Sequence, residues 1–230
     1  MSMREALDLS AYLVIGPENT KGRPVKGIIR DVVAAGFTIV QVRSKVASAK
    51  ELIGYCRDAA EAIAEAGRAD RVALVADDRL DVVLAAREAG IKVDGIHVGQ
   101  SDIPAAVCRK YLGDDAVIGL SARTRELIDY VRTADISDID YFGAGPLHET
   151  ATKSEAGRSA SGRVITRSLE EIAELAQVSP VPAVIGGGVK LADIPDLKRT
   201  GIAGFFVVSA VTEADDPGRA AAALTAAWRA

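Results

Sequence analysis

Polar side chains follow the ends of several apolar segments in this sequence, beginning with TIVQVRSK at residues 38–45. The first five residues are β-branched apart from Gln41, which is typical of a buried strand. Gln41, Arg43 and Lys45 recur at a spacing of two, so an extended chain would point all three toward one face. Two cations on that face indicate an anion site, because Arg can bind phosphate bidentately and Lys adds a point charge. The alternative is a solvated edge of an open sheet.

Carboxylates follow the next two apolar segments. Asp77 and Asp78 lie in VADDR, and Asp102 lies in HVGQSDIP after the following segment. Each Asp alone could cap a helix, since Asp is a good N-cap residue and favours the positive end of the helix dipole. Together, two carboxylates from neighbouring strand ends that face cations are what Mg²⁺ bound to a phosphorylated substrate would need.

Small residues follow three later segments. Ser121 lies in GLSART, where its hydroxyl could face a ligand or belong to a turn. Residues 186–188 are three consecutive glycines, and Ser209 follows the last apolar segment. Glycine lets backbone N–H groups approach a ligand closely, and the loops after the seventh and eighth strands of barrels often bind phosphate. This pattern predicts a monophosphate site, with a flexible turn as the alternative for the glycines.

The segment 146–168 has no apolar periodicity and is rich in Gly, Ser, Thr and charge. Structureless loops of this length are usually functional lids or disordered, so we expect a long mobile loop over the active site. Thr150, Thr152 and Lys153 would provide two hydroxyls and one more cation there, while the role of His148 is left open.

Eight short apolar runs alternate with amphipathic helical patterns. The runs occupy residues 11–15, 37–42, 71–76, 93–98, 116–120, 139–144, 181–186 and 203–208. A helical pattern covers 48–67, and a last helix is predicted over 217–229, with Pro217 in its first turn. Eight strands and intervening helices predict an α/β fold, a single-domain (β/α)₈ TIM barrel over residues 1–230, with an open doubly wound sheet as the alternative. Barrel active sites lie at the carboxyl ends of the strands, where these polar residues fall.

The composition argues against several classes of protein. Of 230 residues, 49% are hydrophobic and 26% charged, and a net charge of −4 with a pI near 5.3 argues against a nucleic-acid binder. No apolar run reaches the length of a membrane span, and the N-terminus lacks the pattern of a secretory signal. Cys56 and Cys108 are expected to be reduced thiols, so a cytoplasmic location is expected by default.

The polar residues thus form two predicted anion sites without an apparent pair of nucleophile and base. His97 has apolar neighbours in the sequence and is expected to be a structural residue rather than a catalyst. Such a site favours a reaction in which diphosphate leaves and another group attacks, because that chemistry depends on positioning and charge neutralisation more than on proton transfer.

Nine short motifs follow one another along nearly the whole chain. They are YLV (12–14), QVRSK (41–45), DDRLDVVLA (77–85), DGIHVGQSD (94–102), GLSART (119–124), GAGP (143–146), TATK (150–153), GGGV (186–189) and VVSAV (207–211). Their order resembles that of the thiamine-phosphate synthase (thiamine-phosphate pyrophosphorylase) family. The resemblance implies a (β/α)₈ transferase that joins 4-amino-2-methyl-5-hydroxymethylpyrimidine diphosphate to 4-methyl-5-(2-phosphooxyethyl)thiazole, giving thiamine phosphate and diphosphate. It also implies Mg²⁺ and a dissociative mechanism, in which diphosphate leaves before the thiazole nitrogen captures the pyrimidine-methyl cation.

The resemblance implies roles for individual residues as well. Arg43, Lys45 and Lys153 would contact the diphosphate as catalytic residues, and Ser121 would be a catalytic contact to the pyrimidine. The substrate-binding residues it implies are Gln41, Arg43, Lys45, Asp77, Ser121, Thr150, Thr152, Lys153, Gly188, Val208 and Ser209. The expected partners are the two small-molecule substrates, with no nucleic acid and no membrane; a homo-oligomer is left open.

Asp78 and Asp102 would hold Mg²⁺ in this resemblance. Asp77 is a departure, since the family usually has Asn at this position, and an ionised Asp only accepts hydrogen bonds whereas Asn also donates. We hypothesise that Mg²⁺ and Arg79 lie close enough to offset the extra charge.

Two alternatives to the synthase function are considered. One is a thiazole tautomerase-like isomerase of the same fold, which the resemblance implies to carry His in place of Pro146. The other is a non-catalytic regulatory barrel.

Overall fold

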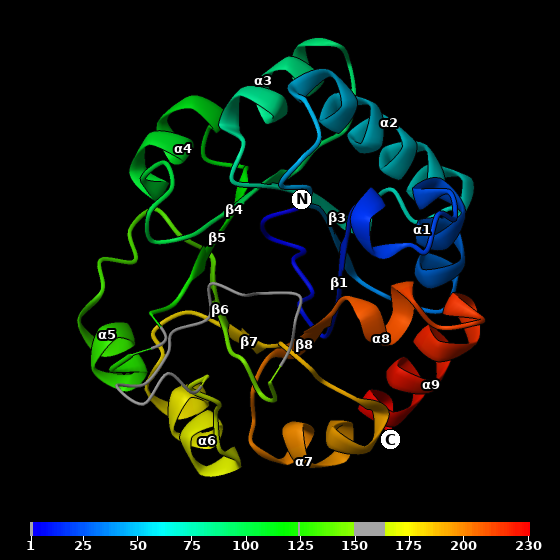
Figure 1. Cartoon of the computed structure of the whole chain (residues 1–230). Helices are drawn as coiled ribbons and strands as arrows, with labels where there is room; N and C mark the ends of the chain where they lie inside the picture. Colours follow the sequence, from blue (N-terminus) through cyan, green and yellow to red (C-terminus); the bar gives the residue numbers. More distant parts are fainter. Residues whose placement is uncertain (1, 124, 150–163) are drawn as a thin grey trace.

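The computed structural model describes residues 2–123, 125–149 and 164–230 of the chain. The strands in these residues are parallel and pair in chain order, and β8 pairs with β1, so the sheet closes into a barrel (Figure 1). They are β1 Ala11–Ile15, β2 Ile39–Val42, β3 Ala73–Asp77, β4 Gly95–Val98, β5 Val117–Ser121, β6 Tyr141–Ala144, β7 Ala183–Ile185 and β8 Gly204–Val207. The predicted (β/α)₈ barrel is therefore confirmed, and the open sheet is wrong.

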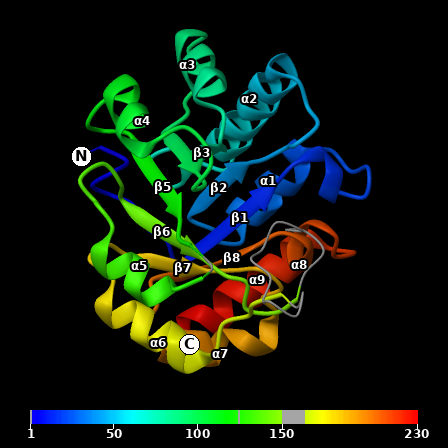
Figure 2. The same ribbon diagram turned by 60° about the vertical axis from the view of Figure 1, so that its left-hand side comes forward.

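Helices follow the strands and surround the barrel (Figures 1 and 2). The α-helices are α1 Val25–Ala34, α2 Ala49–Glu65, α3 Leu80–Glu88, α4 Ala105–Leu112, α5 Leu127–Thr133, α6 Leu169–Val178, α7 Ile194–Arg199, α8 Ser209–Thr212 and α9 Pro217–Arg229. Two 3-10 helices are η1 Pro17–Asn19 and η2 Leu191–Asp193. The last helix has the predicted bounds, and α2 lies inside the predicted segment, beginning at a capping box formed by Ser48 and Glu51.

The core has two parts, separated by the wall of the barrel. Leu13 and Ile15 of β1 belong to the larger part, between the strands and the helices. Tyr12 and Val14 belong to the smaller part, inside the barrel. Alternate residues of one strand thus pack on opposite sides of the wall, as the period of two requires. The same alternation decides which polar residues enter the barrel.

Three further sequence-based expectations concern the chain outside the barrel wall. Cys56 and Cys108 are free and buried. No helix in the described residues has both the length and the apolar character needed to cross a membrane. Of the expected loop 146–168, residues 150–163 lie outside the described residues, so Thr150, Thr152 and Lys153 have no structural account.

Candidate active site

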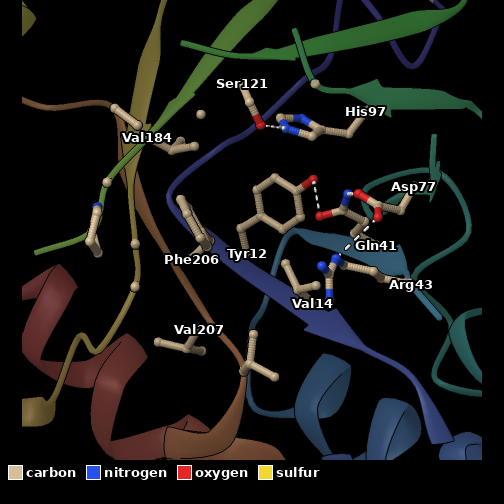
Figure 3. A pocket seen from close by; sticks show the side chains of 18 of the residues that line it. Tyr12, Val14, Gln41, Arg43, Asp77, His97, Ser121, Val184, Phe206 and Val207 are labelled. Atoms are coloured by element: carbon tan, nitrogen blue, oxygen red, sulfur yellow. Dashed lines mark hydrogen bonds and ion pairs between the residues drawn. The ribbon is translucent and has the colours of Figure 1, made fainter. Parts of the chain in front are cut away.

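A cavity of about 320 Å³ opens at the carboxyl ends of the barrel strands. Each of the eight strands contributes lining residues, either from the strand or from the loop directly after it. Figure 3 shows side chains of β1 to β5 pointing toward one another in this cavity. The predicted site residues that line it are Gln41, Arg43, Lys45, Asp77, Asp78, Asp102, Ser121, Gly188, Val208 and Ser209. Among the residues that the structure describes, the predicted site residues therefore lie around one cavity.

Glycine and glutamate residues after β1 hold the cationic end of β2 in place. The Arg43 N–H donates to the carbonyl of Ile15 at 2.9 Å. A Cβ on Gly16 would lie 1.8 Å from the Arg43 carbonyl oxygen, so the close approach of the two chains needs glycine. The Glu18 carboxylate accepts hydrogen bonds from the Ser44 hydroxyl at 2.6 Å and from the Lys45 N–H at 3.0 Å. These contacts fix the backbone that carries both cations.

Both predicted cations form ion pairs with the carboxylates after β3. Arg43 Nε lies 3.1 Å from Asp77 Oδ2, and Lys45 Nζ lies 2.6 Å from Asp78 Oδ2 and 3.9 Å from Asp77 Oδ2. The Arg79 guanidinium, which was expected to offset the Asp77 charge, pairs with Asp81 in the first turn of α3. Arg43 is the near neutralising group, since it follows β2, the strand that pairs with β3.

The carboxylates do not cap helices. Asp78 has a φ of 60°, and α3 begins after Arg79 without a side-chain cap. Asp102 accepts a hydrogen bond from the Gly99 N–H at 2.9 Å, while α4 begins after Pro104 without a side-chain cap. The capping alternative for these residues is therefore wrong, and the left-handed backbone of Asp78 points instead to local strain at the cavity.

Asp78 and Asp102 both line the cavity, and each carboxyl group affects the pKa of the other. Burial raises the pKa of Asp102, and the nearby charge of Asp78 raises it further. Burial acts in the same direction on Asp78, but the hydrogen bond and charge of Lys45 outweigh it and lower the pKa of that group. Two adjacent carboxylates that resist joint ionisation are a donor set that fits a divalent cation. No group of three or more His, Cys, Asp and Glu residues that could hold a metal occurs in the described residues.

Two tyrosines inside the barrel extend this polar cluster inward. Gln41 Nε2 donates to Asp77 Oδ1 at 2.5 Å, and the Tyr12 hydroxyl donates to Gln41 Oε1 at 3.1 Å. The hydroxyls of Tyr12 and Tyr141 lie 2.9 Å apart. Burial raises the pKa of both tyrosines well above its ordinary value, so each keeps its proton.

His97 links these tyrosines to Ser121. Its Nδ1 lies 3.0 Å from the Tyr141 hydroxyl and its Nε2 lies 3.0 Å from the Ser121 hydroxyl (Figure 3 shows the second contact). A Cβ on Gly119 would lie 2.4 Å from His97 Nδ1 and 2.2 Å from the Tyr141 ring, so glycine makes room for the contact. His97 is buried, as expected of a structural residue, and its contact with Ser121 is one that the sequence did not indicate.

Sequence reasoning missed Tyr12, Tyr141 and the exact position of His97. The signal that could have found them is the alternation along each strand. His97 has apolar neighbours, but Ile96 and Val98 pack in the outer part of the core, so the residue between them must point inward. Tyr12 and Tyr141 belong to the interior part by the same rule.

The opposite side of the cavity is lined by glycine-rich backbone. Gly187 and Gly188 have φ angles of 81° and 77°, which L-residues rarely adopt. A Cβ on Gly188 would lie 2.8 Å from the Cβ of His148. The backbone of Val208 and Ser209, at the turn from β8 into α8, completes this side of the cavity. Exposed N–H groups of such backbone suit an anion.

Comparisons with known proteins agree with this geometry. A model of the family described as thiamine monophosphate synthase matches residues 11–211. Thiamine-phosphate synthase of Corynebacterium efficiens is 38% identical over 216 residues, which cover 94% of this chain and 93% of that protein. Thiamine-phosphate synthase of Clostridium tetani is 32% identical over 219 residues, which cover 95% of this chain and 95% of that protein.

Solved structures give the same picture at the level of the backbone. Thiamine phosphate pyrophosphorylase from Pyrococcus furiosus has a TM-score of 0.77 and 25% identity, covering 99% of this chain and 98% of that chain. Tryptophan synthase from Mycobacterium tuberculosis has a TM-score of 0.67 at 14% identity, covering 99% of this chain and 95% of that chain, and shows likeness of fold alone.

Proposed function

Because the chain belongs to the thiamine monophosphate synthase family, we propose that it joins 4-amino-2-methyl-5-hydroxymethylpyrimidine diphosphate to 4-methyl-5-(2-phosphooxyethyl)thiazole. The products are thiamine phosphate and diphosphate. The predicted enzyme class, a transferase of thiamine biosynthesis, agrees with these relatives. The observation that carries the proposal is one cavity with a cation–carboxylate cluster on one side and glycine-rich backbone on the other.

The diphosphate of the pyrimidine substrate is assigned to the cation–carboxylate side. Arg43 and Lys45 would donate to its oxygens, and Lys153 would join them. The hydrogen bond and charge of Asp78 outweigh burial and raise the pKa of Lys45, so that ammonium keeps its proton. These donors stabilise the charge that collects on the leaving group as its bond to carbon breaks.

Mg²⁺ is the proposed cofactor, held by Asp78 and Asp102. It takes oxygen ligands, commonly one or two carboxylates together with substrate phosphates and waters, which suits this pair. When bound, it would neutralise charge on the departing diphosphate. Lys45 contacts Asp78, so the ammonium proposed to bind the diphosphate lies beside a carboxylate proposed to hold the metal.

The thiazole phosphate is assigned to the glycine-rich side. Gly188 and the backbone of Val208 and Ser209 would donate N–H groups to it, with Thr150 and Thr152 as further contacts. Gln41, which donates to Asp77, and Ser121 at the end of β5 would contact the pyrimidine ring. We propose a dissociative order, in which the bond to diphosphate breaks before the thiazole nitrogen attacks. Such a reaction depends on holding two substrates in line and on stabilising charge.

The test combines the purified protein with both phosphorylated substrates, with and without Mg²⁺, and measures thiamine phosphate and diphosphate by chromatography. We expect both products, in equal amounts and only with Mg²⁺. A folded protein that binds the thiazole phosphate but forms neither product would contradict the proposal and favour the tautomerase or regulatory alternative.

Substitution of a proposed metal ligand gives a sharper prediction. Asp78→Asn should lower kcat/KM on the order of a hundredfold and raise the Mg²⁺ concentration needed for half-maximal rate, because the site loses one of the two carboxylates proposed to hold Mg²⁺. The matched control is Asp81→Asn, three residues along the chain, whose carboxylate pairs with Arg79 and does not line the cavity. Equal effects of the two substitutions would count against the metal site.

A further inference from the structure

A chain of hydrogen bonds crosses the interior of the barrel. Its members, here called the interior chain, are in order Asp77, Gln41, Tyr12, Tyr141, His97 and Ser121. We propose that Asp77 is a positioning residue that sets the direction of every hydrogen bond in the interior chain. In that direction Ser121 turns its lone pairs toward the cavity and accepts a hydrogen bond from the amino group of the substrate.

The direction begins at Asp77 because an ionised carboxylate only accepts hydrogen bonds. Arg43 Nε, which can only donate, lies 3.1 Å from Asp77 Oδ2. Gln41 lies 2.5 Å from Asp77 Oδ1 and must therefore present its NH₂ group there. Its carbonyl oxygen then faces Tyr12, from which it must receive a proton.

The same rule passes the direction through both tyrosines. Each has one hydroxyl proton, and burial raises the pKa of both so that it is retained. The proton of Tyr12 is used on Gln41, so Tyr141 must donate to Tyr12. The oxygen of Tyr141 then has only lone pairs to offer His97, and His97 Nδ1 must carry a proton.

His97 transfers the direction to the cavity. A neutral imidazole with a proton on Nδ1 has a lone pair on Nε2, so it accepts from the Ser121 hydroxyl. The Ser121 hydroxyl thus donates its single proton to His97, and toward the cavity it can only accept a hydrogen bond. The tautomer of His97 therefore indicates the donor-to-acceptor direction of all hydrogen bonds in the interior chain.

A Ser121 hydroxyl that accepts a hydrogen bond favours a ligand with an N–H donor. The identity of that ligand rests on the proposed function. In the proposed pyrimidine substrate the exocyclic amino group is the one N–H donor. As diphosphate leaves, positive charge spreads from the methylene carbon into the ring and makes that N–H a stronger donor. A hydrogen bond that strengthens in the transition state favours the rate as well as binding.

The substitution Asp77→Asn should invert the interior chain. Arg43 can only donate, so it would take the oxygen of the new amide and leave its NH₂ group facing Gln41. Gln41 would then flip and present its own NH₂ group to Tyr12. Each later hydrogen bond would reverse in turn, so that His97 carries its proton on Nε2 and Ser121 donates toward the cavity.

The experiment reads the His97 tautomer by ¹⁵N NMR of the free protein labelled on histidine. The chain has only two histidines, and His148→Gln assigns the signals. We expect the proton on Nδ1 in the unsubstituted protein and on Nε2 in Asp77→Asn. A proton on Nε2, or on both nitrogens, in the unsubstituted protein would overturn the proposal, as would an unchanged tautomer in folded Asp77→Asn.

Tyr141→Phe supplies a second variant that interrupts the interior chain between Asp77 and His97. In this background, Asp77→Asn should leave the His97 tautomer as it is in Tyr141→Phe alone. If Asp77→Asn still changed the His97 tautomer in this background, Asp77 would act on His97 by a route other than the interior chain, and that result would overturn the proposal. None of these NMR measurements needs a substrate, so their failure is distinct from failure of the proposed function.

Substrate choice gives the second readout. The enzyme is assayed with the amino pyrimidine diphosphate and with the analogue that carries hydrogen in place of the amine and so has no N–H donor. Asp77→Asn should lower the preference for the amine, measured as the ratio of kcat/KM values, on the order of tenfold, because Ser121 would then offer a donor. Loss of rate on both compounds at an unchanged ratio would overturn this step while leaving the NMR result standing.

Discussion

At the scale of single residues, Glu18 shows how a group outside the reaction controls one inside it. Burial would raise the pKa of Glu18, but hydrogen bonds from the Ser44 hydroxyl and from backbone N–H groups outweigh it and hold the pKa below its ordinary value. A carboxylate with a lowered pKa adds stability above its unfolded pKa, about 4.3, and loses that contribution as the pH falls through the folded value.

Glu18→Gln should therefore lower the free energy of unfolding at neutral pH by no more than about 1 kcal/mol, since the group is exposed. The difference from the unsubstituted protein should vanish at acid pH. Urea unfolding of both proteins at several pH values measures it. A difference that stays constant across the acid range would contradict the assigned hydrogen bonds. The KM for the pyrimidine diphosphate should also rise, because Lys45 loses a backbone contact.

The chemical types that are unusual for a strand end, as at Arg43 and Asp78, led to residues that line the cavity. Sequence analysis failed where the partner decides the role. Arg79 pairs with Asp81 directly after a left-handed turn at Asp78, and the sequence pattern reveals neither feature. The Ser121–His97 contact needs two strands in register, and the register places His97 beside Gly119.

At the scale of elements, β5 must carry glycine where β4 and β6 bring two rings together. A Cβ on Gly119 would lie 2.2 Å from the Tyr141 ring and 2.4 Å from His97 Nδ1. Gly119→Ala should lower the free energy of unfolding by about 1–3 kcal/mol, as overpacking does, and disturb the His97 signals. Gly54→Ala on the exposed face of α2 is the control, since no atom lies within 4 Å of its Cβ position.

The control should be neutral or stabilising by about 0.5–1 kcal/mol, because alanine is the better helix former. Urea unfolding compares the two variants. Similar stability of both alanine variants would show that the barrel interior relaxes around Gly119. The elements themselves were predicted well, because buried parallel strands are nearly continuous in apolar character. Each apolar run coincides with one strand, and only β3 and β5 extend one residue beyond their runs, to Asp77 and Ser121. The interior glycines were not predicted, since their need arises only when neighbouring strands meet.

At the scale of the whole molecule, the sequence predicted the barrel from the number of strands and not from any signal of closure. Closure depends on the pairing of β1 with β8, which are separated by nearly the whole chain. Side chains beyond both strands reinforce that seam. Arg23, after η1, donates from Nη2 to the carbonyl of Thr212 at 2.6 Å and from Nη1 to that of Ala214 at 2.7 Å.

Arg23 therefore ties the loop after β1 to the end of α8, the helix whose first residue is Ser209. Arg23→Ala should free this segment and raise the KM for the thiazole phosphate about fivefold. The effect on the KM for the pyrimidine diphosphate should be smaller, because the contacts of Glu18 with Ser44 and Lys45 do not involve the Arg23 side chain. Lys21→Ala is the matched control: it removes one exposed contact, from Lys21 Nζ to the carbonyl of Glu213 at 2.6 Å, in the same loop. Steady-state kinetics in each substrate separates the outcomes. An equal rise in both KM values would place the effect of Arg23 on the barrel as a whole and not on the phosphate side of the cavity.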